Sequence, residues 1–360
     1  MKLQVAAFVK YSKKGASSRL RFYQFIPWLA AQDIEVTIFP LFGDDYLNQL
    51  YNDNSKSYRL VMRSYLRRIR DLLQVRRYAV IWIEGELMPM IPPVFEKALR
   101  WLKVPYIVDY DDALFHNYEF QHKARHRWLQ PFLGGKIDQV MKHATLVVAG
   151  NEYLAAHARA VGAAWVETMP TVIELQRYQC HVAPPNDPVI VGWIGAPPTV
   201  KYLEMIAPAL KTIQQRFHID IHVIGAAVAP LSGVDYQAIP WHKDTEIEQV
   251  CRFDIGIMPL PDDRWTRGKC GYKLIQYMAC GKPVIASPVG VNEAIVVAGA
   301  NGFLAKSLAD WETALTQLCE SLPLRQQQGQ YSRQLVEKYY HVGVVVPKLV
   351  QYFHQVAGHR

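Results

Sequence analysis

The sequence predicts an α/β protein made of two open, mostly parallel sheets that are covered by helices. Short apolar runs of strand length alternate with amphipathic segments along all 360 residues, which is the pattern of strand–helix–strand units. Half of the residues are hydrophobic, and this length and composition are typical of two globular domains. A proline-rich stretch near the middle, Val182–Pro188, can continue neither a helix nor a central strand. We therefore predict a domain linker there.

The predicted strands are each about as long as a buried strand of a parallel sheet. In chain order they are Leu3–Val9, Glu35–Pro40, Ala79–Ile83, Tyr106–Val108, Leu146–Ala149, Val189–Trp193, Asp220–Ile224, Ile255–Met258 and Val284–Ala286. Residues 1–182 then form an N-terminal Rossmann-like domain and residues 183–340 a C-terminal one. Apolar residues at helical spacing in Leu322–Gly358 predict that residues 341–360 form a helix packing back across both domains. Such doubly wound sheets bind ligands at the carboxyl ends of their strands, so we expect a site in a central cleft that both domains face.

The net charge of +8 is unevenly distributed. Residues 1–180 hold 24 basic and 17 acidic side chains, whereas residues 181–360 hold 16 and 15, which predicts an anionic partner for the N-terminal half. No run approaches about 18 apolar residues and the first ten residues do not resemble a secretory signal, so we expect a cytoplasmic protein without a transmembrane helix. The five cysteines show no C-x-x-C spacing, which indicates a reducing cytosol and no zinc site.

The strongest signal for a ligand site lies in residues 253–304. A strand and a proline-bounded loop lead to Gly271, which is predicted to open a helix. A glycine at a helix mouth lets a ligand approach the backbone, and the free amides of Gly271 and Tyr272 together with the helix dipole favour a diphosphate. Lys269 and Lys273 would add positive charge there.

In this region the sequence resembles the retaining glycosyltransferases of family 4, which are of the group 1 type and have the GT-B fold. The segments that fit the family's motif in register are Gly271, Met278–Gly281, Pro283–Ser287, Gly290, Glu293 and Asn301–Leu304. Both glutamates of the motif are missing, because Gly268 and Gln276 stand at their positions. The resemblance implies that Gln276 holds the donor ribose, since an amide oxygen also accepts hydrogen bonds from hydroxyls. Asp262 or Asp263 could take over the contact to the donor sugar that Gly268 lacks.

Two further segments of the C-terminal half match the same family. Val191–Tyr202 is a strand that runs into a loop, and the resemblance implies a donor contact at Gly195 and a phosphate-binding role for Lys201. By itself, a lysine at a helix start is more often a solvated surface group. Trp241 occupies the family's base-contacting turn, where it either packs against the nucleobase or fills the core of its own domain.

In the N-terminal half, Val104–Phe115 reads as a strand that ends in three carboxylates. The resemblance aligns Asp111 and Asp112 with a His-Asp pair near the donor sugar, where a carboxylate orients the acceptor hydroxyl or steadies the developing charge of the sugar. Close packing of the acids would raise at least one pKa. Asp112 also fits a helix-capping acid. The D-Y-D pattern would suit Mg²⁺ or Mn²⁺, but the resemblance implies a reaction without a metal or a cofactor.

The loop after the first strand is rich in hydrogen-bond donors. Gly15 and Ser18 offer amides and a hydroxyl to an anion, and Arg19 and Arg21 could hold it with their guanidinium groups. The resemblance places this loop over the donor phosphates and the acceptor entrance. Equally, Ser18 could simply cap a helix over Arg19–Ala30.

Residues 56–77 form a strongly basic segment with eight basic residues and one acid. Its arginines at positions 59, 63, 67 and 70 share one helical face, and Leu66, Ile69 and Leu73 share another. Such a helix can lie on an anionic membrane surface, or it can be a solvated helix that packs on its own sheet. Nucleic acid is not expected, because no groove-reading or RNA-reading motif accompanies the charge.

These observations predict a glycosyltransferase that moves a sugar from a nucleotide diphosphate sugar to a glycan or lipid-linked acceptor. By the resemblance, the reaction retains the anomeric configuration, and the protein is cytoplasmic, with peripheral contact to the inner face of the membrane as a further expectation. The absence of both motif glutamates leaves an alternative, a non-catalytic GT-B protein that binds a nucleotide sugar or a glycan. A third reading is a sugar epimerase of similar fold.

Overall fold

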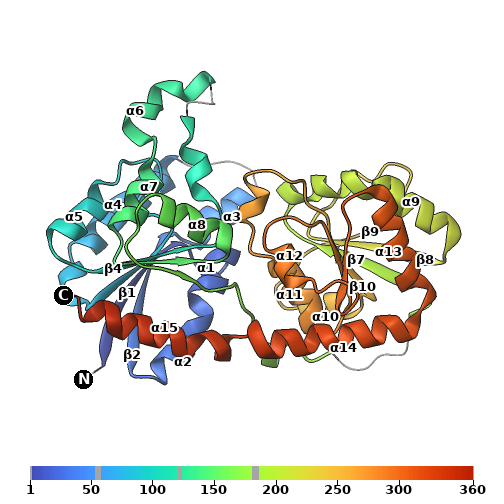
Figure 1. The fold of residues 1–360 in the computed structure, drawn as a ribbon. Coiled ribbons are helices and arrows are strands. Elements are labelled where there is room, and N and C mark those ends of the chain that lie inside the picture. The colour runs from blue at the N-terminus through green and yellow to red at the C-terminus, as the bar shows by residue number, and fades with distance from the viewer. Residues whose placement is uncertain (1, 53–57, 121–123, 181–185, 360) are drawn as a thin grey trace. The chain divides into compact units, whose positions relative to one another are not determined.

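The computed structural model describes residues 2–52, 58–120, 124–180 and 186–359, and it shows two α/β units (Figure 1). Unit 1 comprises Met1–Thr171 and Val342–Arg360, and unit 2 comprises Val172–His341. The chain enters unit 2 before the predicted proline-rich linker, because Ile173 and Tyr178 are already buried in the core of unit 2. Part of that predicted linker, residues 182–185, lies outside the described residues.

Within the described part of unit 1, six parallel strands form one sheet in the order β2-β1-β3-β4-β5-β6. They are β1 (Leu3–Tyr11), β2 (Ile34–Phe42), β3 (Val80–Glu84), β4 (Tyr106–Tyr110), β5 (Leu146–Ala149) and β6 (Val166–Thr168). The central strands β3, β4 and β5 are buried along their whole length. Continuous apolar runs are typical of such strands, because helices cover both faces of a parallel sheet.

Helices flank the sheet of unit 1 on both faces (Figure 1). They are α1 (Ala16–Arg21), α2 (Ile26–Ala30), α3 (Asp44–Asn52), α4 (Tyr58–Leu72), α5 (Val94–Trp101), α6 (Gln130–Leu133), α7 (Lys136–His143), α8 (Glu152–Ala160) and α15 (Val342–Ala357), with short 3₁₀ turns η1 (Tyr23–Phe25), η2 (Val75–Arg77), η3 (Leu114–Tyr118) and η5 (Ala124–Leu129). Helix α15 returns from the end of the chain to this unit, where the Phe353 ring meets the Trp82 ring edge-on at 5.2 Å.

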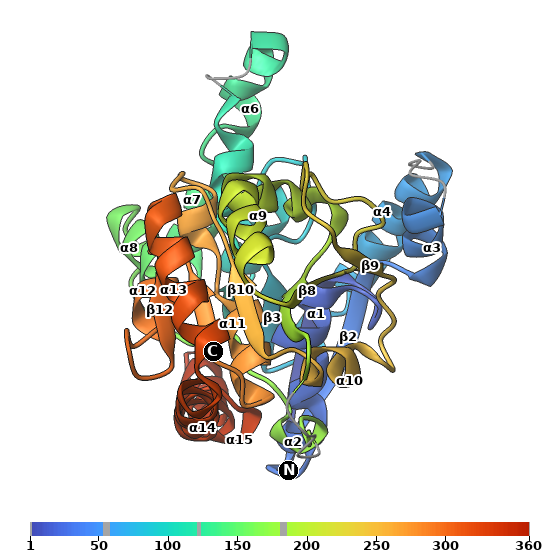
Figure 2. The same ribbon diagram turned by 90° about the vertical axis from the view of Figure 1, so that its right-hand side faces the viewer.

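Unit 2 repeats the architecture, with a parallel sheet in the order β12-β11-β10-β7-β8-β9 over its described residues. Its strands are β7 (Val189–Ile194), β8 (Ile219–Ile224), β9 (Gln237–Ile239), β10 (Ile255–Met258), β11 (Val284–Ala286) and β12 (Gly302–Leu304). Its helices are α9 (Ala207–Arg216), α10 (Glu246–Cys251), α11 (Tyr272–Ala279), α12 (Asn292–Ile295), α13 (Leu308–Glu320) and α14 (Leu322–Tyr339), with 3₁₀ turns η6 (Leu175–Arg177), η7 (Pro197–Ile206) and η8 (Thr266–Gly268). Figure 2 shows α14 nearly end-on, beside α11 and α13.

The predicted fold class is confirmed. Every predicted strand is present, with ends that differ by a few residues. The strands that sequence reasoning missed are β6, β9 and β12, each three residues long and at or next to the edge of a sheet, where the apolar signal is weakest. The predicted C-terminal helical segment is also present, as α14 on unit 2 and α15 on unit 1.

Candidate functional site

The mouth of α11 has the geometry that the sequence predicted. Gly271 is the N-cap residue in the left-handed conformation, with a φ of 67°. A Cβ atom at this position would lie 2.3 Å from Cδ1 of Ile295, so only glycine fits without a shift of the backbone or of Ile295. The first amides of the helix have no intrahelical acceptor, and they lie at the same sheet edge as the ends of β10 and β11. The helix mouth can therefore accept an anion.

Lys273, in the first turn of α11, reaches the loop that follows β7. A Cβ atom built on Gly195 would lie 2.5 Å from its Nζ atom, so the ammonium group occupies the space beside that glycine. The same Nζ atom lies 4.1 Å from the ring centroid of Trp193, within the range of a cation–π contact. Burial, reinforced by the charge of Lys269, lowers the pKa of Lys273 to about 7. A diphosphate beside this group would favour its charged form.

Gln276, one turn further along α11, is held by side chains from two other segments. Its Nε2 atom lies 3.5 Å from Oε1 of Glu246 and 3.4 Å from the hydroxyl oxygen of Tyr178. The indole of Trp241 donates to the other carboxylate oxygen of Glu246 at 2.6 Å. The amide nitrogen of Gln276 therefore faces protein acceptors, which leaves its oxygen as the group able to accept from a ligand hydroxyl.

Sequence reasoning missed Glu246 and Tyr178. Glu246 is the first residue of α10 and is buried, and Tyr178 follows the 3₁₀ turn η6. The sequence carried only a weak signal for either, because each is far from Gln276 along the chain and matches no motif. A buried acid at a helix start reads as a helix cap in the sequence alone.

Trp241 is not part of the hydrophobic core, since 40% of its surface is exposed. A Cβ atom built on Gly225, at the end of β8, would lie 3.5 Å from Cβ of Trp241 and 2.3 Å from the backbone oxygen of Gly195. Gly195, Gly225 and Trp241 thus lie in the loops that follow the successive strands β7, β8 and β9, and the Gly225 loop contacts the other two.

The remaining predicted donor residues differ in their surroundings. Lys201 is exposed within η7, with its Nζ atom 5.5 Å from the Tyr202 ring, and Lys269 lies over the Trp265 ring at 5.3 Å. Asp262 and Asp263, which the sequence analysis considered for a contact with the donor sugar, both form hydrogen bonds with nearby residues. Asp262 forms two hydrogen bonds with Arg267, at 2.6 and 3.0 Å. Asp263 accepts from the backbone amide of Thr266 at 2.8 Å.

In unit 1, the predicted loop and the predicted acids meet at the carboxyl edge of the sheet. The Ser17 hydroxyl donates to Asp111 at 2.5 Å, which connects the start of α1 with the end of β4. Ser18 is fully buried, and its hydroxyl donates to Glu84 at 2.5 Å while accepting from the Tyr11 amide. Burial, with the charge of Asp111 as a second cause, raises the pKa of Glu84 to about 7. Glu84, the last residue of β3, is a titratable group that sequence reasoning missed.

Two expectations for this loop need correction. Arg21 does not face an anionic ligand, because it is 1% exposed and pairs with Asp109 at 2.7 and 3.0 Å. Asp109 lies inside β4 rather than at its end, and burial raises its pKa to about 6, against the effect of Arg21. Ser18 does not cap a helix, since α1 begins at Ala16 with Gly15 as the N-cap.

The other predicted residues of this region are placed as follows. Arg19 is buried within α1, and Asp112 is half-buried directly after Asp111. The sequence did not predict a second charged cluster, which is formed by the loop after β3, by η3 and by α7. Buried Lys136 contacts Glu86 at 2.5 Å, and the Tyr118 hydroxyl donates to the same carboxylate at 2.6 Å. Among the three predicted acids, the pKa of Asp109 is raised mainly by burial, and the charge of Asp111 is the smallest of its causes.

The basic segment of residues 56–77 contains α4, whose orientation is unusual for an arginine-rich helix. Arg68 points inward, where it is 1% exposed and donates to the backbone oxygens of Val9 and Phe39 at 2.7 and 3.0 Å. An apolar stripe points outward instead, formed by Tyr58, Met62, Leu66, Ile69 and Leu73, all of which are exposed. The helix thus packs on its own sheet and presents an apolar stripe to solvent. No described helix is long and apolar enough to cross a membrane.

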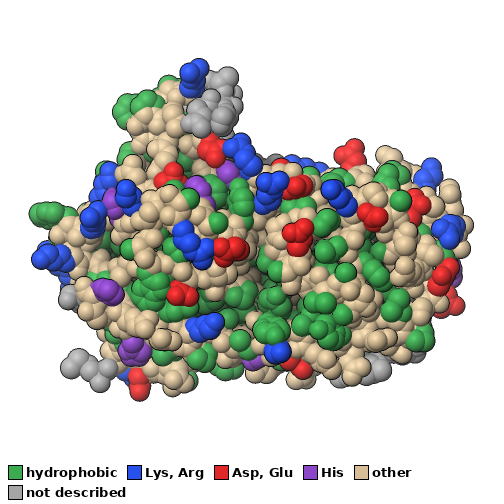
Figure 3. All heavy atoms as spheres, in the orientation of Figure 1, with side chains coloured by type: hydrophobic (Ala, Val, Ile, Leu, Met, Phe, Trp, Pro, Cys, Tyr) green, Lys and Arg blue, Asp and Glu red, His purple; other side chains and the backbone are tan. Residues whose placement is uncertain are grey.

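A second exposed apolar surface lies on a helical projection of unit 1, formed by η5 and α6. Trp128 and Phe132 are 68% and 67% exposed there. Figure 3 shows hydrophobic and basic side chains together on this projection. Its sequence, H-K-A-R-H-R-W, is basic like that of α4, although residues 121–123 lie outside the described part.

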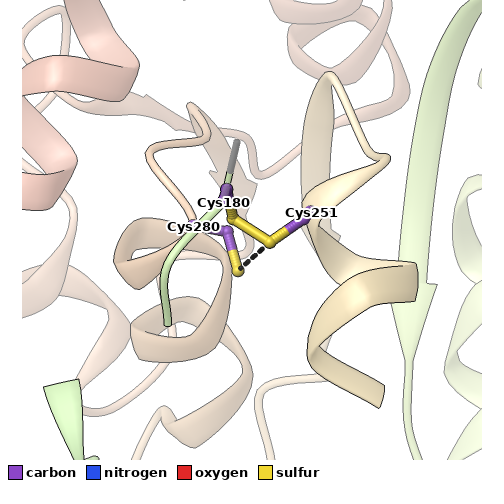
Figure 4. Close-up of side chains that lie close together, drawn as sticks. All are labelled: Cys180, Cys251 and Cys280. Atoms are coloured by element: carbon purple, nitrogen blue, oxygen red, sulfur yellow. Dashed lines mark hydrogen bonds between the residues drawn. A yellow bond between two sulfur atoms is a disulfide. The ribbon is translucent and has the colours of Figure 1, made fainter. Parts of the chain in front are cut away.

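The cysteines depart from expectation. Cys180 and Cys251 form a disulfide, and the thiol of Cys280 lies 3.7 Å from the sulfur of Cys251 (Figure 4). The sequence did not predict this group, because its members are separated by 71 and 29 residues and the spacing rules address only nearby cysteines. Cys270 and Cys319 form no disulfide.

Comparisons with known proteins agree with this architecture. Residues 188–321, all within unit 2, match the family model described as glycosyl transferases group 1. No curated protein sequence matches the chain. Similar solved structures include sucrose-phosphate synthase of Thermosynechococcus elongatus, with 14% identity, a TM-score of 0.71 and coverage of 100% of both chains. HepE of Anabaena, solved with UDP and also with UDP-glucose, has 14% identity and a TM-score of 0.68 in the UDP complex, where 99% of this chain and 100% of that chain are covered.

WaaG, a glycosyltransferase involved in lipopolysaccharide biosynthesis, is a third similar structure. It has 13% identity and a TM-score of 0.66, with 98% of this chain and 99% of that chain covered. At these identities the likeness concerns the fold, which extends over both units. The chain therefore has the GT-B fold of glycosyltransferases, and its second unit matches glycosyl transferases group 1.

Proposed function

We propose that the protein is a glycosyltransferase that transfers a sugar from a nucleotide diphosphate sugar to a glycan or lipid-linked acceptor. The observation that carries the proposal is the position of Lys273, whose ammonium group lies beside Gly195 and one turn from the helix mouth at Gly271. The match of unit 2 to glycosyl transferases group 1 supports it. Within the described residues, Lys273 has no carboxylate in salt-bridge range, so its charge is available to a ligand.

The donor would bind unit 2 through its diphosphate. The amides of Gly271 and Tyr272, together with the charges of Lys273 and Lys269, would stabilise the negative charge that develops on the leaving group. Lys201 would add a further charge from η7. In this proposal the reaction retains the anomeric configuration and needs no metal ion and no cofactor, because positioned cations and amides supply the leaving-group stabilisation.

The nucleoside part of the donor would bind next to the diphosphate. Gln276 is proposed to hold the ribose through its side-chain oxygen, because its nitrogen faces Glu246 and Tyr178. Trp241, with a large exposed ring, would stack on the nucleobase. Uracil is the first base to test, because HepE was solved with UDP and UDP-glucose.

For the acceptor, we propose a role for the carboxyl edge of the unit 1 sheet. Asp111 and Asp112 are the proposed catalytic residues, which would orient the acceptor hydroxyl, and the loop from Gly15 to Arg19 would line the entrance. Glu84 lies one hydrogen bond away from this loop, through Ser18. A carboxyl group with a pKa near 7 can exchange a proton at neutral pH, which suits a reaction that releases an acceptor proton.

Thermal unfolding with a panel of UDP, GDP, ADP and CMP sugars tests the donor assignment. A donor that binds only the folded protein raises the free energy of unfolding, by about 2.7 kcal/mol at a ligand concentration one hundred times Kd, and the melting temperature rises with it. We expect one nucleotide series to act, and we expect Lys273→Ala to abolish both the shift and the transfer of sugar. An unchanged melting temperature with every nucleotide sugar would overturn the proposal.

The non-catalytic alternative rests on a specific observation, namely the glycine at position 268. This residue is buried in η8 and has no side chain to contact the donor sugar. A purified protein that binds a nucleotide sugar, yet releases no free nucleotide diphosphate with any glycan or lipid-linked acceptor, would favour a binding protein. Conversion of the donor into another sugar nucleotide without an acceptor would instead reveal an epimerase.

A membrane surface is proposed as the place where a lipid-linked acceptor is met, at the inner face of the membrane in a cytoplasmic protein. The apolar stripe of α4 is bordered by exposed arginines at positions 59, 63 and 70, a combination that suits an anionic bilayer. We expect cosedimentation with phosphatidylglycerol vesicles but not with phosphatidylcholine vesicles. Leu66→Glu should abolish it, and Val228→Glu, an equally exposed site in unit 2, should not. Loss of binding in Phe132→Glu alone would assign the bilayer contact to the projection and overturn the role of α4.

A further inference from the structure

Three cysteines from three segments of unit 2 form one compact cluster. The sulfur atoms of Cys180, Cys251 and Cys280 all lie within 4.8 Å of one another (Figure 4). Cys180 and Cys251 are bonded to each other and half-buried, whereas Cys280 is buried and keeps its thiol. Because the bonded sulfur of Cys251 carries no hydrogen, the thiol of Cys280 is the donor in the 3.7 Å hydrogen bond between them. The cluster is thus a disulfide with a third thiol in contact.

Each cysteine is attached to a segment that holds Gln276. Cys180 comes two residues after Tyr178, whose hydroxyl lies 3.4 Å from the Gln276 amide. Cys251 is the last residue of α10, which begins with Glu246, the other contact of that amide. Cys280 is the C-cap residue of α11, the helix that carries Gln276 itself. The covalent state of the sulfurs therefore determines which of these three segments are tied together.

A hydrogen-bonding arginine also joins two of the backbone segments around the cluster. One guanidinium nitrogen of Arg333, in α14, donates to the backbone oxygens of Tyr178 and Ala279, at 2.7 and 2.6 Å. This arginine bridges the residue before Cys280 and the segment of Cys180, independently of the sulfurs. The Tyr178 backbone thus stays attached to α11 when the disulfide changes, so that only its covalent tie to α10 is gained or lost and the unit stays folded.

We propose that the cluster is a thiol–disulfide exchange site that adjusts nucleotide-sugar binding at Gln276. In the exchange step, the Cys280 thiolate attacks the sulfur of Cys251. The bond between Cys251 and Cys280 forms as the bond to Cys180 breaks, and the leaving Cys180 thiolate takes up the proton that Cys280 gave away. No external oxidant is required, because the number of disulfides is unchanged.

The exchange has structural consequences that differ between the two forms. In the observed form, the disulfide links the Tyr178 segment to α10. Tyr178 and Glu246, the two residues that contact Gln276, therefore lie on covalently linked segments. In the exchanged form, α10 is tied to α11, and the Tyr178 segment loses its covalent tie to α10 while Arg333 still attaches it to α11. Burial raises the pKa of Cys280 to about 12, with Lys282 and Arg333 acting in the opposite direction, so the observed form is stable until the thiol is deprotonated. Reduction by an external dithiol breaks the disulfide in either form.

Disulfide mapping by mass spectrometry tests the chemistry without any nucleotide. After incubation of the full chain in a mixture of oxidised and reduced glutathione, we expect peptides with Cys180–Cys251 and with Cys251–Cys280 linkages. The Cys280→Ser variant should give only the first linkage, and Cys180→Ser only the second. Cys319→Ser, at a distant free cysteine of α13, is the matched control and should behave as wild type. Finding neither linkage, or one tightly held zinc ion per reduced chain, would overturn the exchange site in favour of free thiols or a metal site.

Calorimetric titration with a UDP sugar tests the link to donor binding, which rests on the proposed function. We expect Kd to rise by about tenfold when the wild type is reduced, because Tyr178 and α10 lose their tie. Cys180→Ser should bind as weakly as the reduced protein under both conditions, whereas Cys319→Ser should respond as wild type. Equal affinity in all covalent states would overturn the link. Absence of nucleotide binding in every state, with both linkages present in the mapping, would overturn the proposed function and leave the exchange chemistry standing.

Discussion

At the scale of single residues, the candidate donor site is defined by the contacts of two polar side chains, Gln276 and Lys273. The amide nitrogen of Gln276 is engaged by Glu246 and Tyr178, and the Lys273 ammonium group lies on an aromatic face beside Gly195. A lysine in such surroundings loses charge more readily than in water, because little solvent compensates the ion. The chemistry of the site should therefore depend on pH within the physiological range.

Binding of a nucleoside diphosphate should weaken above pH 7. The pKa of Lys273 is lowered to about 7 in the free protein, and a bound diphosphate raises it, so binding takes up a proton at higher pH. Below pH 7 the lysine is already charged and the affinity is constant. Above pH 7 the affinity should fall towards tenfold per pH unit, as measured by titration calorimetry in buffers of different ionisation enthalpy. Lys273→Met should bind weakly and show no such slope.

Substitution of Gln276 by glutamate should destabilise this protein. In Gln276→Glu, the new carboxyl group lies next to the buried Glu246 carboxylate, and its pKa should rise by about two units, equivalent to about 2.7 kcal/mol. A folded-state pKa above the unfolded value means that stability is retained below about pH 4.3 and is lost as the pH rises through the folded value. Urea unfolding should show a small deficit at pH 4.5 and the full deficit at pH 8.

The double variant Gln276→Glu with Glu246→Gln is the control for that prediction. It restores one carboxylate and one amide in exchanged positions, so most of the deficit at pH 8 should disappear. An equal deficit in the single and the double variant would show that packing, rather than the pair of charges, is responsible.

At the scale of elements, the site depends on glycine positions where a strand or loop meets a helix. The segment before α11 turns through Gly271 in the left-handed conformation, packed against Ile295 of α12. The helix mouth can present free amides only if this turn is kept. The elements themselves follow from local sequence, but the contact with α12 is tertiary.

Gly271→Ala should destabilise unit 2 and displace the start of α11. The positive φ and the 2.3 Å approach to Ile295 both oppose a methyl group, and together we expect a loss of about 2–4 kcal/mol in the free energy of unfolding. Gly43→Ala, where nothing lies within 4 Å of the new atom, is the matched control and should be nearly neutral. Comparable losses in both variants would contradict the packing argument.

At the scale of the whole molecule, the chain crosses between its units twice. The second crossing brings α15 back to unit 1, where it packs on β3 and α2, while α14 packs on α11 and α13 of unit 2. The stability of unit 1 thus depends on the last residues of the chain. Two clusters of buried apolar residues lie wholly within unit 2 and a smaller one, around Leu41 and Tyr46, lies wholly within unit 1, so we expect the unfolding of the units to be distinguishable experimentally.

Phe353→Ala should selectively destabilise unit 1. The side chain is fully buried against Trp82, and removal of a buried phenylalanine costs about 3–5 kcal/mol. In differential scanning calorimetry, we expect Phe353→Ala to lower the transition temperature of unit 1. A bound nucleotide sugar should raise the transition temperature of unit 2. Phe132→Ala, at an exposed ring, should leave both transitions in place. If the ligand shifts the transition that Phe353→Ala lowers, the assignment of the donor to unit 2 is wrong.

The sequence by itself determined the fold class, the central strands of both sheets, the helix mouth at Gly271 and the segment that contains α4. These features have local signals, because apolar runs, glycine at helix starts and helical spacing act within a few residues. The pKa of Asp109 near the end of β4 is raised, as expected for one of the three acids there, but burial rather than crowding of acids is the main cause. Cytoplasmic location, the donor and the acceptor stay predictions.

Only the tertiary structure decided which polar groups meet. The ion pair of Arg21 with Asp109, the contact of Ser18 with Glu84 and the grouping of Cys180 with two other cysteines join residues that lie far apart in the chain. In each case the physical reason is the same. The side chains of a parallel sheet and its loops meet across crossover connections, so their partners depend on strand order, which local sequence patterns do not encode.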